Sequence, residues 1–86
     1  MWAVAAFLLL WQADYTSDGM KALEEGKYDA AVHAFTKAID ADAKDYFAHF
    51  NLAMAYTLLH KDAEAAAEYR KTLELKPGLV QAGLQF

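Results

Sequence analysis

The sequence predicts an all-α fold made of stacked, repeated helical units. Two stretches repeat each other at an offset of 34 residues, with four identical pairs: Met20 and Met54, Lys27 and Lys61, Ala31 and Ala65, and Lys37 and Lys71. Only one proline and four glycines interrupt the 86 residues, and hydrophobic residues, many of them the helix-forming alanine, make up 57%. A repeat of this length is typical of helical units that must pack on a neighbour to bury their apolar faces.

Composition excludes several classes of function. The 8 basic and 12 acidic residues are interspersed and give a net charge of −4, whereas nucleic-acid binding needs a clustered basic stripe. We therefore expect no nucleic-acid partner. The chain has no cysteine, so neither a disulfide nor a thiolate metal site supplements its small core.

The chain opens with an unbroken apolar run over residues 2–11. As a helix this run would span about 15 Å, roughly half of the hydrocarbon core of a bilayer, so it is too short to cross a membrane. Its length matches the apolar region of a signal peptide, although no Lys or Arg precedes it. We interpret residues 1–13 as a leader-like or membrane-anchoring segment. The alternative is a structural helix that packs on the repeats or on another chain.

Residues 14–45 form the first predicted unit. Its first helix ends near Gly26, because glycine tolerates the positive φ that is common at helix C-termini, and Asp29 is the expected N-cap of its second helix. Apolar and small residues recur at helical spacing on the packed faces of the two helices: Tyr15, Gly19, Ala22 and Leu23, then Ala31, Phe35, Ala38 and Ile39. A charged connector over residues 40–45 follows.

Residues 46–79 form the second predicted unit. Helices are expected over residues 46–59 and 62–75, and Pro77 ends the second of them because proline cannot continue a helix. Their packed faces repeat the pattern of the first unit: Ala48, Leu52, Ala53 and Tyr56, then Ala65, Tyr69, Thr72 and Leu73. Residues 80–86 are expected to begin a capping helix or a third repeat.

Two segments, residues 26–39 and 51–56, resemble the tetratricopeptide repeat. The family has small residues where its helices cross, and the matching positions here are Gly19, Ala31, Ala38, Ala53 and Ala65. It has large aromatic residues in the wedge between helices, and the matching positions here are Tyr28, Phe35, Tyr56 and Tyr69. Pro77 matches the closing proline of the family, whereas the first unit has Ala43 there. The resemblance covers residues 12–79. It implies antiparallel helix pairs stacked as a short right-handed α-solenoid, with two full repeats and a truncated third.

An apolar stripe on the third helix is the most informative surface. Its residues fall at spacings of three, four and four, which places them on one side of the helix: Phe47, Phe50, Met54 and Leu58. In the family that the chain resembles, the first helix of each unit lines a concave groove. The resemblance therefore implies a groove lined by seven residues: Met20, Leu23, Phe47, Phe50, Asn51, Met54 and Leu58. Such a surface suits an amphipathic helix or an extended peptide, and the alternative is that the stripe is covered as ordinary core.

The sequence carries no pattern for catalysis or for metal binding. His33, His49 and His60 lie far apart and on different predicted elements, not at the i, i+4 spacing of a helical metal pair. A glycine-rich phosphate loop and a cysteine nucleophile are absent from the sequence. We therefore expect no enzyme activity, no cofactor and no metal.

These observations predict a protein–protein interaction scaffold that presents a concave helical groove to a peptide or helix of a partner. The leader-like start favours an exported bacterial setting, periplasmic or membrane-associated through residues 1–13, with the cytoplasm as the alternative. A competing prediction is a self-associating homo-oligomer whose groove is filled by its own apolar N-terminal segment.

Overall fold

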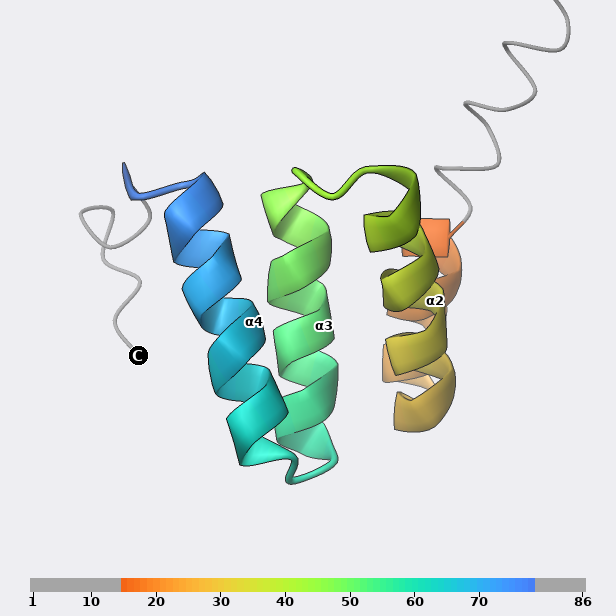
Figure 1. Cartoon of the computed structure of the whole chain (residues 1–86). Coiled ribbons are helices and arrows are strands. Elements are labelled where there is room, and N and C mark those ends of the chain that lie inside the picture. Colours follow the sequence, from red (N-terminus) through yellow and green to blue (C-terminus); the bar gives the residue numbers. More distant parts are fainter. Residues whose placement is uncertain (1–14, 79–86) are drawn as a thin grey trace, which may run out of the picture.

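The computed structural model describes residues 15–78, which are helical apart from short connections (Figure 1). Residues 15–24 are helical, and three further helices follow: α2 (Tyr28–Ala41), α3 (Tyr46–Leu58) and α4 (Asp62–Leu75). The all-α prediction is confirmed, and this part of the chain contains no strand. The predicted leader or anchor over residues 1–13 and the predicted helix start over residues 80–86 lie outside the described residues.

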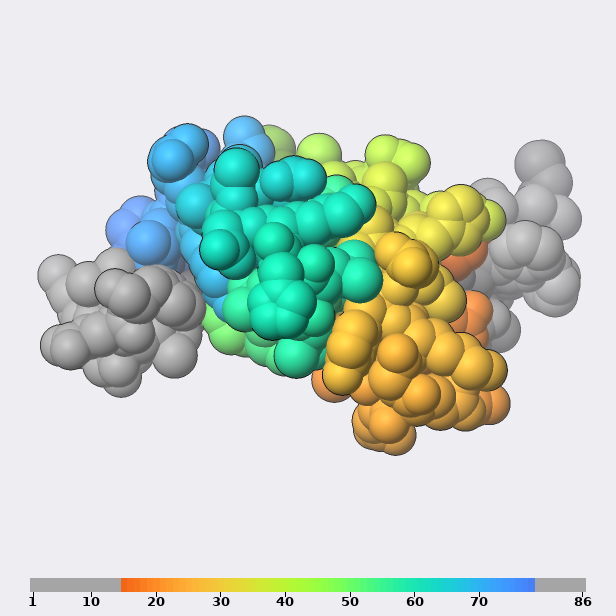
Figure 2. Space-filling model, turned by 90° about the horizontal axis from the view of Figure 1, so that it is seen from below, coloured from red at the N-terminus to blue at the C-terminus, as the bar shows by residue number. Residues whose placement is uncertain are grey.

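The helices are arranged as two stacked pairs. The chain reverses direction at each connection, so that consecutive helices run antiparallel, and α3 lies between α2 and α4 (Figure 1). Residues 15–24 and α2 make the first pair, and α3 and α4 make the second. From below, the described helices form one continuous body (Figure 2). Among residues 15–78, no helix is both long enough and apolar enough to cross a membrane.

Most predicted helix boundaries hold, with three corrections. The fourth helix has the predicted bounds, Asp62–Leu75, and the third ends one residue early, at Leu58. The N-cap prediction is wrong, because α2 begins at Tyr28 and Lys27 stands at the cap position without a side-chain hydrogen bond. Asp29 lies instead in the first turn, where a negative charge interacts favourably with the helix dipole. The connector is also shorter than predicted, since α2 continues to Ala41.

The two units end their first helices with the same hydrogen-bonded turn. In the first unit the N–H groups of Gly26 and Lys27 donate to the carbonyls of Leu23 (3.1 Å) and Ala22 (2.8 Å). In the second unit the N–H groups of His60 and Lys61 donate to the carbonyls of Thr57 (3.0 Å) and Tyr56 (2.9 Å). This is the Schellman pattern, which needs a positive φ at the first donor. Gly26 has φ 75° and meets this need without strain, whereas His60 has φ 60°.

Replacing His60 with glycine is expected to stabilise the fold by about 0.5–1 kcal/mol. A side chain in the left-handed region costs roughly 1–2 kcal/mol, and the greater freedom of glycine in the unfolded chain offsets part of the gain. Urea unfolding of the full chain measures the change. The matched control is Gly26→His, which places the same strain in the first unit and should destabilise by a similar amount. Equal stability of His60→Gly and wild type would show that this turn carries no strain.

The core is built from small residues packed around one large ring. The buried cluster comprises Ala22, Ala31, Phe35, Leu52 and Ala55, with Leu23, Val32, Ile39 and Tyr56 packed against it. Phe35 is 0% exposed and is the largest fully buried side chain. Gly19 lies directly against this ring, since a Cβ atom at Gly19 would come within 2.4 Å of Phe35 Cε1. The small residues predicted at helix crossings therefore include one position where even alanine does not fit without movement.

Candidate functional site

The exposed large apolar side chains of the described residues lie only on the first helix of each unit. They are Met20 on the helix over residues 15–24, and Tyr46, Phe47 and Leu58 on α3, with exposures of 37%, 38%, 55% and 45%. On α2 and α4 the large apolar side chains are buried or half-buried. Within residues 15–78, the exposed large apolar side chains are thus confined to one kind of helix. Such confinement is typical of a surface that contacts a partner.

The predicted stripe on α3 is open at its two ends and partly covered between them. Phe47 and Leu58 are exposed, whereas Phe50 and Met54 are half-buried. The ring of Phe50 meets the ring of Tyr69 edge-on, with centroids 5.8 Å apart and an interplanar angle of 62°. This contact fixes the middle of the stripe to α4. In the first unit, Met20 is exposed and Leu23 is half-buried against the core.

Asn51, the polar residue of the predicted groove, lies in the interior. It is 1% exposed, and its amide nitrogen Nδ2 has no hydrogen-bond partner among the described residues. An unsatisfied buried donor destabilises a fold by roughly 1–3 kcal/mol. The resemblance implied that Asn51 lines the groove. In the structure the side chain of Asn51 is instead buried, so it is not exposed at the surface of α3.

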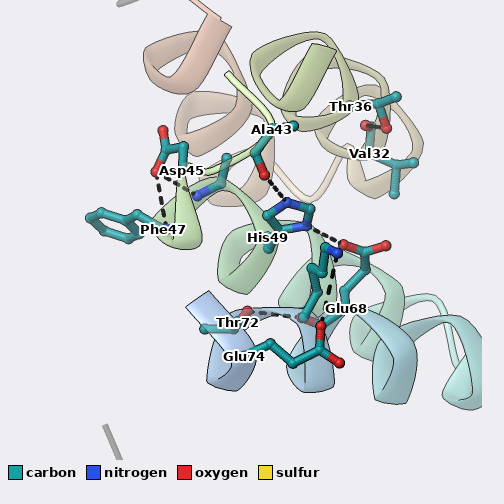
Figure 3. A network of polar contacts seen from close by, with 11 residues as sticks. Val32, Thr36, Ala43, Asp45, Phe47, His49, Glu68, Thr72 and Glu74 are labelled. Atoms are coloured by element: carbon teal, nitrogen blue, oxygen red, sulfur yellow. Dashed lines mark hydrogen bonds and ion pairs between the residues drawn. The ribbon is translucent and has the colours of Figure 1, made fainter. Parts of the chain in front are cut away.

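The start of α3 is fixed by an aspartate that we had assigned to the connector. Asp45 is the N-cap of α3, and its Oδ1 accepts hydrogen bonds from the N–H groups of Phe47 (3.0 Å) and Ala48 (3.2 Å) (Figure 3). Its position immediately before an apolar helical pattern is the sequence signal that could have identified it. The exposed ring of Phe47 therefore projects from a capped helix start. Lys76 Nζ lies 5.7 Å from the ring centroid of the neighbouring Tyr46.

A polar network links α3 to α4 and to the connector that precedes α3 (Figure 3). His49 is buried on α3, with Nδ1 2.7 Å from Glu68 Oε1 on α4 and Nε2 2.9 Å from the carbonyl oxygen of Ala43. The hydroxyl of Thr72 donates to the carbonyl of Glu68 at 2.8 Å. Sequence reasoning missed this network, because His49 and Glu68 are 19 residues apart and follow no recognisable spacing.

The remaining polar side chains of residues 15–78 form neither a metal-ligand cluster nor a buried ion pair between Lys and Glu. No three His, Asp or Glu side chains of this part of the chain come together as metal ligands. The two pairs between Lys and Glu, Lys27 with Glu25 (3.6 Å) and Lys71 with Glu74 (3.8 Å), are largely exposed. Exposed ion pairs contribute little to stability, typically below about 1 kcal/mol.

Comparison with known proteins agrees with the arrangement of the helices. Residues 19–80 match the sequence model of the tetratricopeptide repeat. The chain belongs to the tetratricopeptide repeat family. The matched segment includes α2, α3 and α4 entirely and most of the helix before them. The family match confirms the resemblance and supports a protein-interaction module over an enzyme.

The chain is also similar to parts of longer curated proteins. It is 32% identical over 73 residues to a tetratricopeptide repeat and J domain-containing co-chaperone, DNJ1, of Cryptococcus neoformans. It is 31% identical over 71 residues to the photosystem I assembly protein Ycf3 of Cyanophora paradoxa. It is 28% identical over 64 residues to a STIP1 homolog of Dictyostelium discoideum.

The alignments cover most of this chain and a minor part of each relative. They include 85%, 79% and 74% of this chain, and 14%, 41% and 11% of the respective relatives. The chain thus spans less than half the length of each of these proteins. No solved structure matches it significantly.

Proposed function

We propose that this chain is a scaffold that binds a peptide or an amphipathic helix of a partner protein along the first helices of its two repeats. The proposal rests on one observation: the exposed large apolar side chains of residues 15–78 are confined to these helices. The relatives named as a co-chaperone and as an assembly protein are in keeping with a role in contacts between proteins.

The stripe on α3 suits an apolar partner with two anchoring side chains. Phe47 and Leu58 would each contact one anchor, and the half-buried Phe50 and Met54 would form the floor between them. Burying one large apolar side chain is worth roughly 1.5–3 kcal/mol. Methionine adapts its shape to different ligands, so Met20 and Met54 would accommodate more than one sequence. The unpaired Nδ2 of Asn51 would reach a peptide carbonyl only if its neighbours move on binding.

Serine at Phe47 and at Leu58 is expected to weaken binding at least about tenfold each, because each substitution removes an exposed apolar contact. Peptides selected by display against the full chain supply the ligands, and fluorescence anisotropy measures their affinity. Ala30→Ser on α2 and Ala67→Ser on α4 are the controls, since both residues are exposed on second helices. Unchanged affinity in both stripe variants, with affinity lost in a control, would contradict the proposal.

A homo-oligomer is the second proposal, and the apolar run over residues 2–11 favours it. In that case the run, from the same chain or from a second copy, would cover the stripe. Sedimentation velocity over a wide concentration range separates the two proposals. A concentration-independent monomer that still binds display-selected peptides would exclude self-association as the function.

The cellular setting stays a prediction. An exported bacterial location, periplasmic or membrane-associated, depends on residues 1–13, which lie outside the described residues. N-terminal sequencing of the protein made in a secreting bacterium tests it. A mature chain that begins at Met1 would argue against a cleaved leader and leave the cytoplasm or an anchored state.

A further inference from the structure

The chain leaves the second helix of each repeat in the same way. α2 ends at Ala41 and α4 ends at Leu75, which keeps the repeat offset of 34 residues. In both repeats the N–H of the following residue donates to a carbonyl of the last helical turn, at 3.0 Å from Asp42 and at 2.9 Å from Lys76. The backbone there is also alike, with φ −149° and ψ 96° at Asp42 and φ −140° and ψ 74° at Lys76. The chain therefore leaves α4 in the direction that, after α2, leads to α3.

The outer side of α4, which corresponds to the side of α2 that faces α3, is less covered than its counterpart. On α2, Phe35 packs in one cluster with Leu52 and Ala55 of α3 and is 0% exposed. The matching residue of α4 is Tyr69, which is only half-buried. Among residues 15–78, no helix follows α4 in the stack (Figure 1). The described part of the chain thus ends on a helix whose outer side is not covered as that of α2 is.

The last residues of the sequence carry the pattern that the outer side of α4 requires. At the repeat offset, residues 79–86 correspond to the N-cap and first turns of α3. Ala48 and Leu52 are the buried apolar residues of that part of α3, at 1% and 4% exposure. They are matched by Ala82 and Phe86. A spacing of four residues places this pair on one side of a helix.

We propose that residues 79–86 pack as a short helix on the outer side of α4, with Ala82 and Phe86 against Tyr69, and so close the stack of repeats. The contact removes apolar surface of both aromatic rings from water, which is the main favourable contribution to such packing. It lies at the edge of the stack and leaves the stripe on α3 open. The proposal therefore does not depend on the proposed binding function.

A second copy of the chain fits the outer side of α4 less well. A copy stacked in the manner of a further repeat would place its first helix, residues 15–24, on α4. At the repeat offset this helix presents Asp18 and Lys21, both exposed, where α3 presents Leu52 and Ala55. Burying these charged side chains against an aromatic ring costs free energy that the apolar pair at the end of the same chain does not.

Nuclear Overhauser effects in the full chain test this contact directly. We expect cross-peaks from the ring protons of Tyr69 to the ring of Phe86 and to the methyl group of Ala82. A mixture of isotope-labelled and unlabelled chains shows whether the contact lies within one chain. Absence of these cross-peaks, or cross-peaks that arise only between chains, would overturn the proposal.

The substitution Phe86→Ser measures how much the contact contributes to stability. In urea unfolding of the full chain, we expect the unfolding equilibrium constant to rise at least about tenfold, because a buried apolar side chain is removed. Gln81→Ser is the matched control, since Gln81 corresponds to the exposed Phe47 and should change the constant by no more than about twofold. Equal effects of the two substitutions would overturn the proposal. If Phe86→Ser does not fold, the cross-peaks of wild type decide.

Discussion

Replacing Phe35 with alanine is expected to destabilise the protein by about 3–5 kcal/mol, because the substitution empties the centre of the core. The ring is 0% exposed and is the largest fully buried side chain of the described residues, so its removal leaves a large space at the centre of the buried cluster. Domains of this size have a small free energy of unfolding. We therefore expect most of the helical circular dichroism signal to be lost at room temperature.

Thr36→Ala is the matched control for Phe35→Ala. Thr36 is the next residue on α2, is exposed, and its hydroxyl donates to the Val32 carbonyl of its own helix (2.7 Å). Surface substitutions of this kind change stability by no more than about 0.5 kcal/mol. Urea unfolding of both variants measures the difference. A Phe35→Ala variant that is as stable as Thr36→Ala would show that the core lies elsewhere.

Replacing Gly19 with alanine is expected to destabilise the protein by about 1–3 kcal/mol, although alanine is by far the better helix former. The added Cβ would lie 2.4 Å from Phe35 Cε1 and 2.7 Å from Cδ1 and Cζ. The buried ring of Phe35 cannot relieve these close contacts unless the helix over residues 15–24 moves away from α2. The steric cost therefore exceeds the gain of about 1 kcal/mol in helix propensity.

Two variants test the steric origin of the Gly19→Ala effect. Gly78→Ala adds the same methyl group where no atom lies within 4 Å, so it should be close to neutral. In a Phe35→Leu background the smaller side chain leaves room for the methyl group, and the cost of Gly19→Ala should shrink or reverse. Additive effects of the two substitutions would contradict a direct clash.

The repeat, the helices and the core were accessible from the sequence because their signals are local. Spacing of apolar residues along one helix identified the buried positions of α2, including Ala31, Phe35 and Ala38. Recurrence at an offset of 34 residues indicated the stacked units, and the bounds of α4 followed from Pro77 and from the pattern itself. The helix bounds and the buried positions depend on neighbours within a turn or two, whereas the stacking of units follows from the 34-residue repeat.

Features that depend on packing between helices were missed. The left-handed backbone of His60 follows from the turn geometry that Gly26 adopts in the first unit, and the residue type alone does not indicate it. The burial of Asn51 and the contact between His49 and Glu68 arise only when α3 and α4 meet. For the same reason, spacing alone could not show that Phe47 and Leu58 are open while Phe50 and Met54 are half covered.

The most direct test of the proposed binding surface is a chemical-shift map of the full chain, recorded as a display-selected peptide is added. We expect the largest changes on the first helices of the two repeats, at Met20, Phe47, Met54 and Leu58. The exposed faces of α2 and α4, around Ala30 and Ala67, should change little. Changes centred on those outer faces, with the stripe unaffected, would contradict the proposed binding surface.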